Sequence, residues 1–259
     1  MNTPKQISQW RIVAASVCGT SHIKNQQLCQ DAHHWQILPN DVLVIAAADG
    51  AGSASLGKVG AMIAVETAIE HISDCENIPS ILAEDGLLHD LLTESILAAK
   101  KAVEDEADVC KHQPDDLAST LIIAIATPKV VAVAQIGDGL AVAKDSTGNL
   151  QALTIPNHGE YINETTFLTS SDALTTTQIK ILRHNIVNIG VLTDGLQMLA
   201  LNMLIGEPHK PFFFPLFDFV ANAEDKIVAK EQLVKFLCSD KITKRTDDDL
   251  TLVIASLSN

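Results

Sequence analysis

The stretch that decides how this chain folds reads Val42-Leu-Val-Ile-Ala-Ala-Ala-Asp49-Gly50-Ala-Gly52-Ser53. A short apolar run that ends in turn residues is typical of a buried strand. Glycine after the acid lets the backbone come close to a bound ion or phosphate. Taken alone, Asp49-Gly50 also fits a plain hairpin turn, so the rest of the chain must separate the two interpretations.

The pairing of an apolar run with an acid recurs along the chain. Residues 130–136 run into Gly137-Asp138-Gly139, residues 188–193 run into Asp194-Gly195, and Asp248 precedes the apolar run 250–254. Carboxylates gathered at strand ends repel one another and lose hydration, and both effects are unfavourable unless a cation compensates for them. The recurrence therefore predicts a site for a hard cation, which prefers oxygen ligands. Asp85-Gly86 lies between two helical patterns, and there we expect only a turn.

Composition restricts the class of protein. The 259 residues carry a formal net charge of −14, which argues against a nucleic-acid partner. No linker or repeat divides the chain, so we expect one domain over residues 1–259. The polar N-terminus and the lack of an apolar run near the ~20 residues that span a bilayer predict a soluble, cytoplasmic protein without a membrane partner. Five widely spaced cysteines without a Cys-x-x-Cys pair indicate neither a disulfide framework nor a zinc cluster.

Hydrophobic periodicity predicts an α+β fold. Apolar runs predict strands over residues 10–17, 30–38, 42–48, 118–126, 130–136, 140–144, 150–154 and 188–193. Helical spacing predicts helices over residues 62–72, 86–109, 196–204 and 224–237, with Ser53 or Ser55 available to cap the first. Consecutive hairpins imply antiparallel sheets, and the helices do not alternate regularly with strands.

Two further segments leave alternatives open. The polar segment 156–171 around Tyr161 is either a lid over the site or an ordinary surface loop. The segment 211–219 holds five of the seven phenylalanines, and its two flanking prolines argue against a regular helix. We expect these phenylalanines to pack a mobile subdomain onto the core, with partner docking as the second interpretation.

Taken in order, the motifs resemble those of the metal-dependent type 2C serine/threonine protein phosphatases, the PPM family, and most closely a bacterial branch of it. The resemblance runs from about residue 15 to residue 254. It is carried by an ordered series: Ser21-His22-Ile23-Lys24, Gln30-Asp31-Ala32, Asp49-Gly50-Ala51-Gly52, Ala118-Ser119-Thr120, Gly137-Asp138-Gly139, Thr193-Asp194-Gly195 and Asp248-Asp249-Leu250-Thr251.

The resemblance implies two packed antiparallel β-sheets flanked by α-helices, a four-layer αββα sandwich, with two core Mn²⁺ or Mg²⁺ ions at one end. Asp49 would bridge the ions, the Gly50 carbonyl would ligate one, and Asp194 and Asp248 would complete the other. Asp31 would hold metal-bound water. Asp138 would help to bind a labile third ion.

The implied activity is hydrolysis of phosphoserine and phosphothreonine in proteins by a hydroxide that bridges the two metals. Asp31, Asp49 and Asp194 are then the catalytic residues. The partners are a phosphorylated protein and a cognate Ser/Thr kinase. A weakly active regulatory relative and a hydrolase of small phosphate esters are the alternatives.

Three departures from the family pattern bear on the site. Gln30 stands where many members have a metal-binding Glu, so the second metal should bind more weakly. Asp249 replaces a common Asn, and Ala51 stands where some eukaryotic members have a general-acid His. The phosphate-binding Arg has no clear match, which leaves Lys24 or His22 as candidates for substrate binding.

Overall fold

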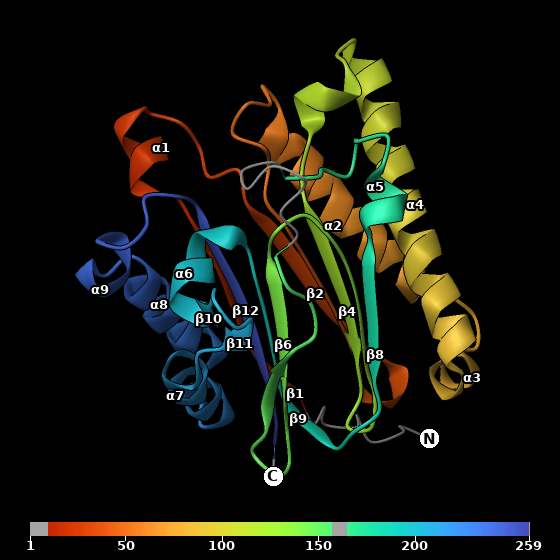
Figure 1. Cartoon of the computed structure of the whole chain (residues 1–259), viewed down its shortest axis with the longest axis vertical. Helices are drawn as coiled ribbons and strands as arrows, with labels where there is room; N and C mark the ends of the chain where they lie inside the picture. The colour runs from red at the N-terminus through yellow and green to blue at the C-terminus, as the bar shows by residue number, and fades with distance from the viewer. Residues whose placement is uncertain (1–9, 157–164, 259) are drawn as a thin grey trace, which may run out of the picture.

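Two five-stranded antiparallel sheets form the centre of the computed structural model, which describes residues 10–156 and 165–258 (Figure 1). The first sheet has the order β1 (Trp10–Val17), β12 (Leu250–Leu257), β9 (Ile186–Leu192), β6 (Leu140–Asp145) and β7 (Leu150–Ala152). The second has the order β2 (Ala32–Leu38), β3 (Val42–Ala48), β4 (Leu121–Ala126), β5 (Val131–Ile136) and β8 (Gln178–Leu182). A short separate pair joins β10 (Leu201–Asn202) to β11 (Glu207–Pro208).

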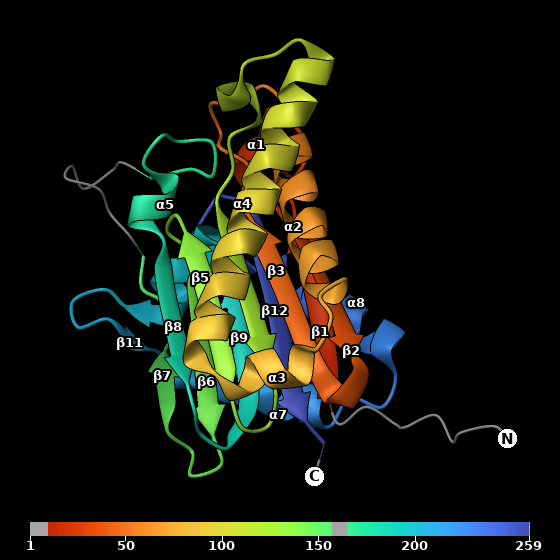
Figure 2. The same ribbon diagram turned by 90° about the vertical axis from the view of Figure 1, so that its right-hand side faces the viewer.

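Helices cover the outer face of each sheet, which completes the expected four layers. The second sheet is covered by α2 (Gly57–Ser73) and α4 (Asp85–Cys110), with α3 (Ile78–Ala83) at one end and α5 (Ala173–Thr176) beside them (Figure 2). The first sheet is covered by α7 (Lys210–Ala221) and α8 (Lys226–Leu237). Short helices occupy the loops: α1 (Thr20–Lys24), α6 (Gln197–Ala200), α9 (Asp240–Thr243), and the 3₁₀ turns η1 (Pro39–Asp41), η2 (Pro114–Leu117) and η3 (Asp194–Leu196).

Strand β3, which contains most of the stretch that decides the fold, is buried on both of its faces. In β3, Val42, Val44 and Ala46 pack into the cluster formed with α2 and α4. Leu43 and Ile45 point the other way, into the layer between the two sheets. A strand covered on both sides must be apolar at every position, which explains why its sequence shows no polar alternation.

The prediction that prolines prevent a helix at 211–219 is wrong, because this segment lies within α7. Pro211 stands in the first turn, where the helix needs no N–H, and Pro215 removes only the bond to the Pro211 carbonyl. The rings of Phe213 and Phe217 are fully buried and stack at 5.9 Å between centroids. Their burial outweighs the lost hydrogen bond and fixes α7 on the first sheet.

Other local predictions are also wrong. The helix expected over 196–204 is instead η3, α6 and the β10–β11 hairpin, and β8 was not predicted. Neither Ser53 nor Ser55 caps α2, which begins after Leu56, and Ser55 Oγ donates instead to the Asp116 carboxylate at 3.3 Å. Asp85 is the first residue of α4 and not a turn.

The segment around Tyr161 lies outside the described residues. Within those residues, no helix is long and apolar enough to cross a membrane.

Close packing of α2 against η2 gives a stability prediction. A Cβ at Gly60 would lie 1.9 Å from the Leu117 carbonyl oxygen, whereas a Cβ at Gly52 would meet no atom within 4 Å. Gly60→Ala should therefore lower the free energy of unfolding by about 1–3 kcal/mol through overpacking. Gly52→Ala, the matched control, should change it by less than about 0.5 kcal/mol. Denaturant melts of the two variants check this, and equal midpoints would contradict it.

Candidate metal centre

Strand pairing brings the predicted acids to one end of the sandwich. In the second sheet, Asp31 precedes β2 and Asp49 follows β3, and the register pairs Ala32 with Ala48. Asp138 lies in the turn between β5 and β6. In the first sheet, Leu192 pairs with both Leu140 and Leu252, so the turn after β5, the end of β9 and the start of β12 also meet. Asp194 and Asp248 project from those last two ends.

A backbone clamp holds the Asp49 turn. The Asp49 N–H donates to the Thr120 Oγ1 at 2.9 Å, and the Thr120 N–H returns a bond to the Asp49 carbonyl at 2.8 Å. Gly50 forms an isolated bridge with Ser119. A Cβ at Gly50 would lie 2.4 Å from the backbone of Gly57, so only glycine lets the start of α2 approach this turn. The Asp49 side chain is thus aimed by rigid backbone and not by a flexible loop.

Asp31 links the two sheets through hydroxyl groups. Its Oδ2 accepts a hydrogen bond from Thr193 Oγ1 at 2.7 Å, and Thr193 Oγ1 itself accepts from the Thr251 N–H at 3.0 Å. The Thr251 hydroxyl is 2.5 Å from Ser16 Oγ on β1. The other carboxylate oxygen, Asp31 Oδ1, is buried without a hydrogen-bond partner.

A buried glutamine shapes the turn that carries Asp138. Gln135 Nε2 donates to the carbonyls of Gly137 at 3.1 Å and Gly139 at 2.9 Å. The Asp138 carboxylate accepts from Thr165 Oγ1 at 2.6 Å, and its carbonyl accepts from Gln197 Nε2 at 3.0 Å. Asp138 is therefore held in place, and one of its carboxylate oxygens remains without a side-chain donor among the described residues.

Burial and mutual repulsion raise the pKa of the gathered carboxylates. Burial is the largest cause for each of them, and it brings the pKa of Asp31 to about 7 and that of Asp194 to about 8. The pKa of Asp49 lies well above its usual range because burial is joined by the charges of Asp31, Asp194 and Asp248. Burial also raises the pKa of Asp248, and the hydrogen bond from the Asp249 N–H opposes that rise. These carboxylates are close enough to repel one another.

Asp249 organises the loop that leads to Asp31. It is 1% exposed, and its two oxygens accept the N–H groups of Gly19 and Gln30, each at 2.6 Å. His22 Nδ1 lies 2.9 Å from the same carboxylate. Lys24, the other candidate for substrate binding, is exposed at the end of α1. In the sequence, Asp249 is notable only because it replaces the Asn of the family motif. Its structural role could not be predicted, because its backbone partners Gly19 and Gln30 are far away in the chain.

The residues present fit hard divalent cations. The gathered donors are carboxylate and carbonyl oxygens, the ligand type that Mn²⁺ and Mg²⁺ prefer. Asp31 Oδ1 and the neighbouring Gln30 Oε1 are buried without a protein partner, which is costly unless another group satisfies them. Among the described residues no Lys or Arg forms an ion pair with Asp31, Asp49 or Asp194.

Comparison with known proteins agrees with this geometry. The family model described as protein phosphatase 2C matches residues 18–238. The chain belongs to the protein phosphatase 2C family. It is 39% identical over 252 residues to serine/threonine-protein phosphatase 3 of Escherichia coli (strain K12), with 95% of this chain and 98% of that protein covered.

Solved structures of other phosphatases share the fold at lower identity. A bacterial serine phosphatase superposes with a TM-score of 0.67 at 14% identity, covering 96% of this chain and 98% of that one. The catalytic domain of the serine/threonine protein phosphatase PstP, in complex with 2 manganese ions, superposes with a TM-score of 0.63 at 16% identity, covering 96% and 99%. The expected four-layer fold is thus confirmed.

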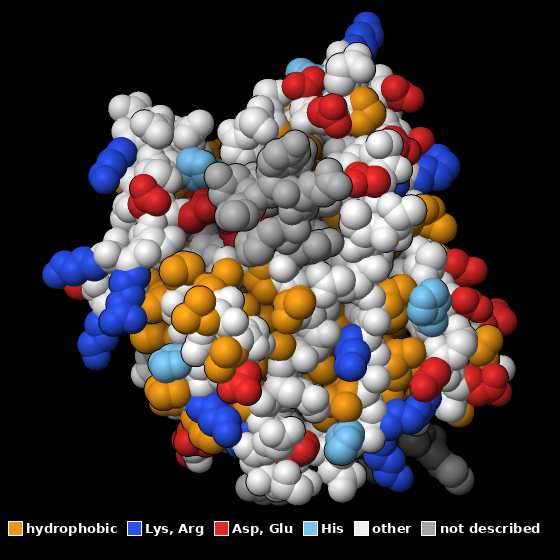
Figure 3. All heavy atoms as spheres, viewed as in Figure 1, with side chains coloured by type: hydrophobic (Ala, Val, Ile, Leu, Met, Phe, Trp, Pro, Cys, Tyr) orange, Lys and Arg blue, Asp and Glu red, His pale blue; other side chains and the backbone are white. Residues whose placement is uncertain are grey.

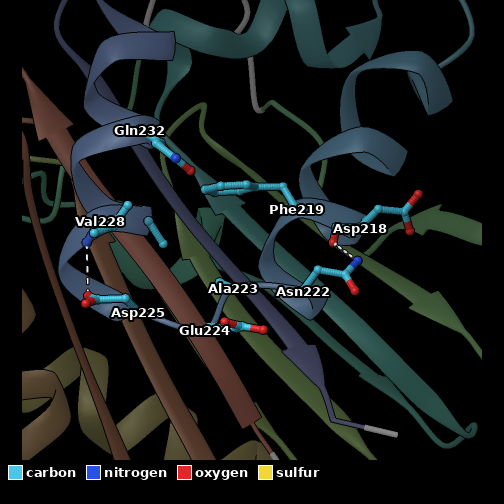
Figure 4. A pocket seen from close by; sticks show the side chains of 9 residues that line it. Asp218, Phe219, Asn222, Ala223, Glu224, Asp225, Val228 and Gln232 are labelled. Atoms are coloured by element: carbon cyan, nitrogen blue, oxygen red, sulfur yellow. Dashed lines mark hydrogen bonds between the residues drawn. The ribbon is translucent and has the colours of Figure 1, made fainter.

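A recess elsewhere on this phosphatase-family fold has no comparable chemistry. It measures about 620 Å³ and lies between α7 and α8 (Figure 4). Of its acids, Asp225 caps α8 by accepting the N–H groups of Ile227 and Val228, and the Asp218 carbonyl accepts from Asn222 Nδ2. Asp225 and Asn222 thus serve the ends of α8 and α7, and the recess lies at the seam between these two helices.

The raised pKa values predict how the metal-free protein responds to pH. A carboxyl whose pKa is near 4 when unfolded and about 7 to 8 when folded holds its proton more tightly in the folded state. The stability that this supplies is present at low pH and is lost as the pH rises from about 4 through 8. With a chelator present, the melting temperature should fall over that range, and Mn²⁺ should raise it more at pH 8 than at pH 5.

The control is Asp194→Asn, which removes one of the carboxyl groups whose pKa is strongly raised. Its melting temperature in chelator should depend less on pH between 5 and 8 than that of the unmodified protein. An identical pH slope in the two proteins would contradict the proposed origin of the effect.

Proposed function

We propose that this protein is a Mn²⁺- or Mg²⁺-dependent serine/threonine protein phosphatase that uses the carboxylate cluster as its metal centre. The observation that carries the proposal is the convergence of Asp31, Asp49, Asp194 and Asp248 from the ends of strands in both sheets, with pKa values raised by burial and mutual charge. Family membership supports the reaction class.

The expected role of each residue is compatible with its position. Asp49, held at the end of β3 by Thr120, would bridge two ions, and the Gly50 carbonyl would contribute an oxygen to one of them. Asp194 and Asp248 would hold the other ion. When bound, the ions supply Lewis acidity and an activated water for attack on phosphorus. Asp31, oriented by Thr193, would accept a hydrogen bond from that water through its unpaired oxygen.

His22 is the better candidate of the two for contacting substrate phosphate. The His22 ring faces the buried Asp249 carboxylate at 2.9 Å, whereas Lys24 is an exposed side chain at the end of α1. A positioned group loses less conformational entropy when it binds than a free lysine does.

We assign Asp138 to a third, weaker ion. Its carboxylate is close enough to Asp194 for its charge to raise the pKa of Asp194.

An exposed apolar surface favours a protein substrate over a small ester. It begins at Met198, four residues after Asp194. Figure 3 shows hydrophobic side chains, in orange, gathered over α6 and the β10–β11 hairpin. Met198, Leu204 and Ile205 there are each more than half exposed. Exposed apolar patches of this kind mark surfaces that contact other proteins. A phosphorylated protein, modified by a Ser/Thr kinase, is thus the proposed partner, and the cytoplasmic location stays a prediction.

Substitution of the central carboxylates tests the proposal. Asp49→Asn and Asp194→Asn should each lower Mn²⁺-dependent turnover of a phosphopeptide by at least about 100-fold, because each removes a ligand charge from the ions. Asp85→Asn should retain activity, since Asp85 is the first residue of α4, pairs with Arg183, and lies away from the acids because α4 begins at the other end of the sandwich (Figure 1). Excess chelator should abolish turnover. Full turnover in chelator, or equal losses at all three positions, would refute the site.

Asp138 provides a second test that separates catalysis from metal assembly. Asp138→Ala should lower kcat strongly while two ions remain tightly bound, because the inner carboxylates are untouched. If Asp138 only shapes the turn that Gln135 supports, the substitution should reduce stability more than kcat. Calorimetric metal titration beside turnover measurements distinguishes the two results.

A further inference from the structure

Three groups of different chemistry meet beside β1 and β12. The Sγ of Cys18, a ring nitrogen of His22 and a carboxylate oxygen of Asp249 all lie within 4.8 Å of one another. The register explains why, because Val17 pairs with Leu250, so the residue after β1 lies opposite the residue before β12. The short helix α1 then returns His22 toward this pair. The spacing of cysteines in the sequence does not reveal this arrangement.

The bonding of these groups leaves capacity for another ligand. Each oxygen of Asp249 accepts one backbone N–H, which leaves a lone pair on each. His22 Nδ1 faces Oδ2 at 2.9 Å, but the contact does not have the geometry of a hydrogen bond. Cys18 is a free thiol whose contact with a backbone carbonyl spans 3.7 Å. A buried ring nitrogen that faces a carboxylate without a well-formed hydrogen bond, with a thiol within 4.8 Å, is the arrangement expected of ligands around a cation.

We propose that Cys18, His22 and Asp249 bind a thiophilic divalent cation of the Zn²⁺ class at a site distinct from the oxygen-ligated centre. Sulfur and imidazole ligands select Zn²⁺, whereas Mn²⁺ and Mg²⁺ prefer oxygen. Ligand atoms around tetrahedral zinc are about 3.5 Å apart, given bonds of about 2.0–2.3 Å. The three ligand atoms already lie within 4.8 Å of one another, so binding requires them to approach by about 1 Å, and His22 lies on the five-residue helix α1. Three protein ligands leave a fourth position for water.

A cation at this site acts on the neighbouring metal centre through the backbone. The Asp249 N–H donates to Asp248 Oδ1 at 2.8 Å, and the Asp249 carboxylate also holds the Gln30 N–H. A metal on Asp249 therefore ties β1, α1 and the Asp248 segment together. Binding releases the thiol proton of Cys18 to solvent, since the thiolate is the ligand.

Cobalt spectroscopy tests the proposal without reference to phosphatase activity. Co²⁺, used as the spectroscopic substitute for Zn²⁺, should produce a near-ultraviolet sulfur-to-cobalt charge-transfer band when added to the chelator-stripped, reduced full-length protein. The oxygen-ligated centre cannot produce that band. Cys18→Ser should abolish it, and His22→Gln should weaken Co²⁺ affinity at this site by at least about tenfold. Cys29→Ser, a half-buried cysteine in the same part of the fold, is the matched control and should retain the band.

Alkylation supplies a second measurement that needs no substitution. Zn²⁺ should slow iodoacetamide modification of Cys18, read by mass spectrometry, without slowing that of the exposed Cys110. No charge-transfer band in the unmodified protein, a band that survives in Cys18→Ser, or an unchanged alkylation rate at Cys18 would each overturn the site. These results would leave the proposed phosphatase activity untouched, because they do not concern the carboxylate cluster.

Discussion

Repulsion among carboxylates is the constraint around which the rest of the structure is arranged. Asp31, Asp49 and Asp194 are drawn together in partly or wholly buried positions, and burial raises the free energy of their charged forms. Among the described residues no Lys or Arg side chain neutralises them. The framework must hold these groups together against their own electrostatics until a cation neutralises them.

The two sheets provide that framework through packing energy. The layer between the sheets is built mainly from fully buried aliphatic side chains, such as Ile45, Ile122 and Val253, and further apolar clusters lie under the helices. Strand ends set by this packing cannot move apart without breaking sheet registers. Hydroxyl groups then aim the acids, as when Thr193 bonds to Asp31 and Thr120 bonds to the Asp49 backbone. A neutral hydroxyl donor orients a carboxylate without neutralising it, which leaves the charge available for metal.

At the same end of the sandwich, the segment that follows the first strand contacts the segment that precedes the last strand. Asp249 joins the loop after β1 to the segment before β12, and Gly19 permits the contact because a Cβ there would lie 2.3 Å from the Asp248 backbone. One buried carboxylate thereby fixes the neighbours of Asp31 and Asp248 at once. Identity of 39% to a phosphatase of Escherichia coli supports the reaction class, while solved structures at 14–16% identity support only the fold.

Local patterns in the sequence were sufficient to predict the main strands, the helices α2, α4 and α8, and the acids at the strand ends. These features depend on apolar periodicity and turn residues, which are properties of neighbouring positions. Periodicity could not predict α7, because the burial of Phe213 and Phe217 outweighs the two prolines. Nor could it predict the roles of Asp249, Gln135 and Cys18. Their partners are distant in sequence or are backbone groups, and only the pairing of strands from opposite ends of the chain brings them together.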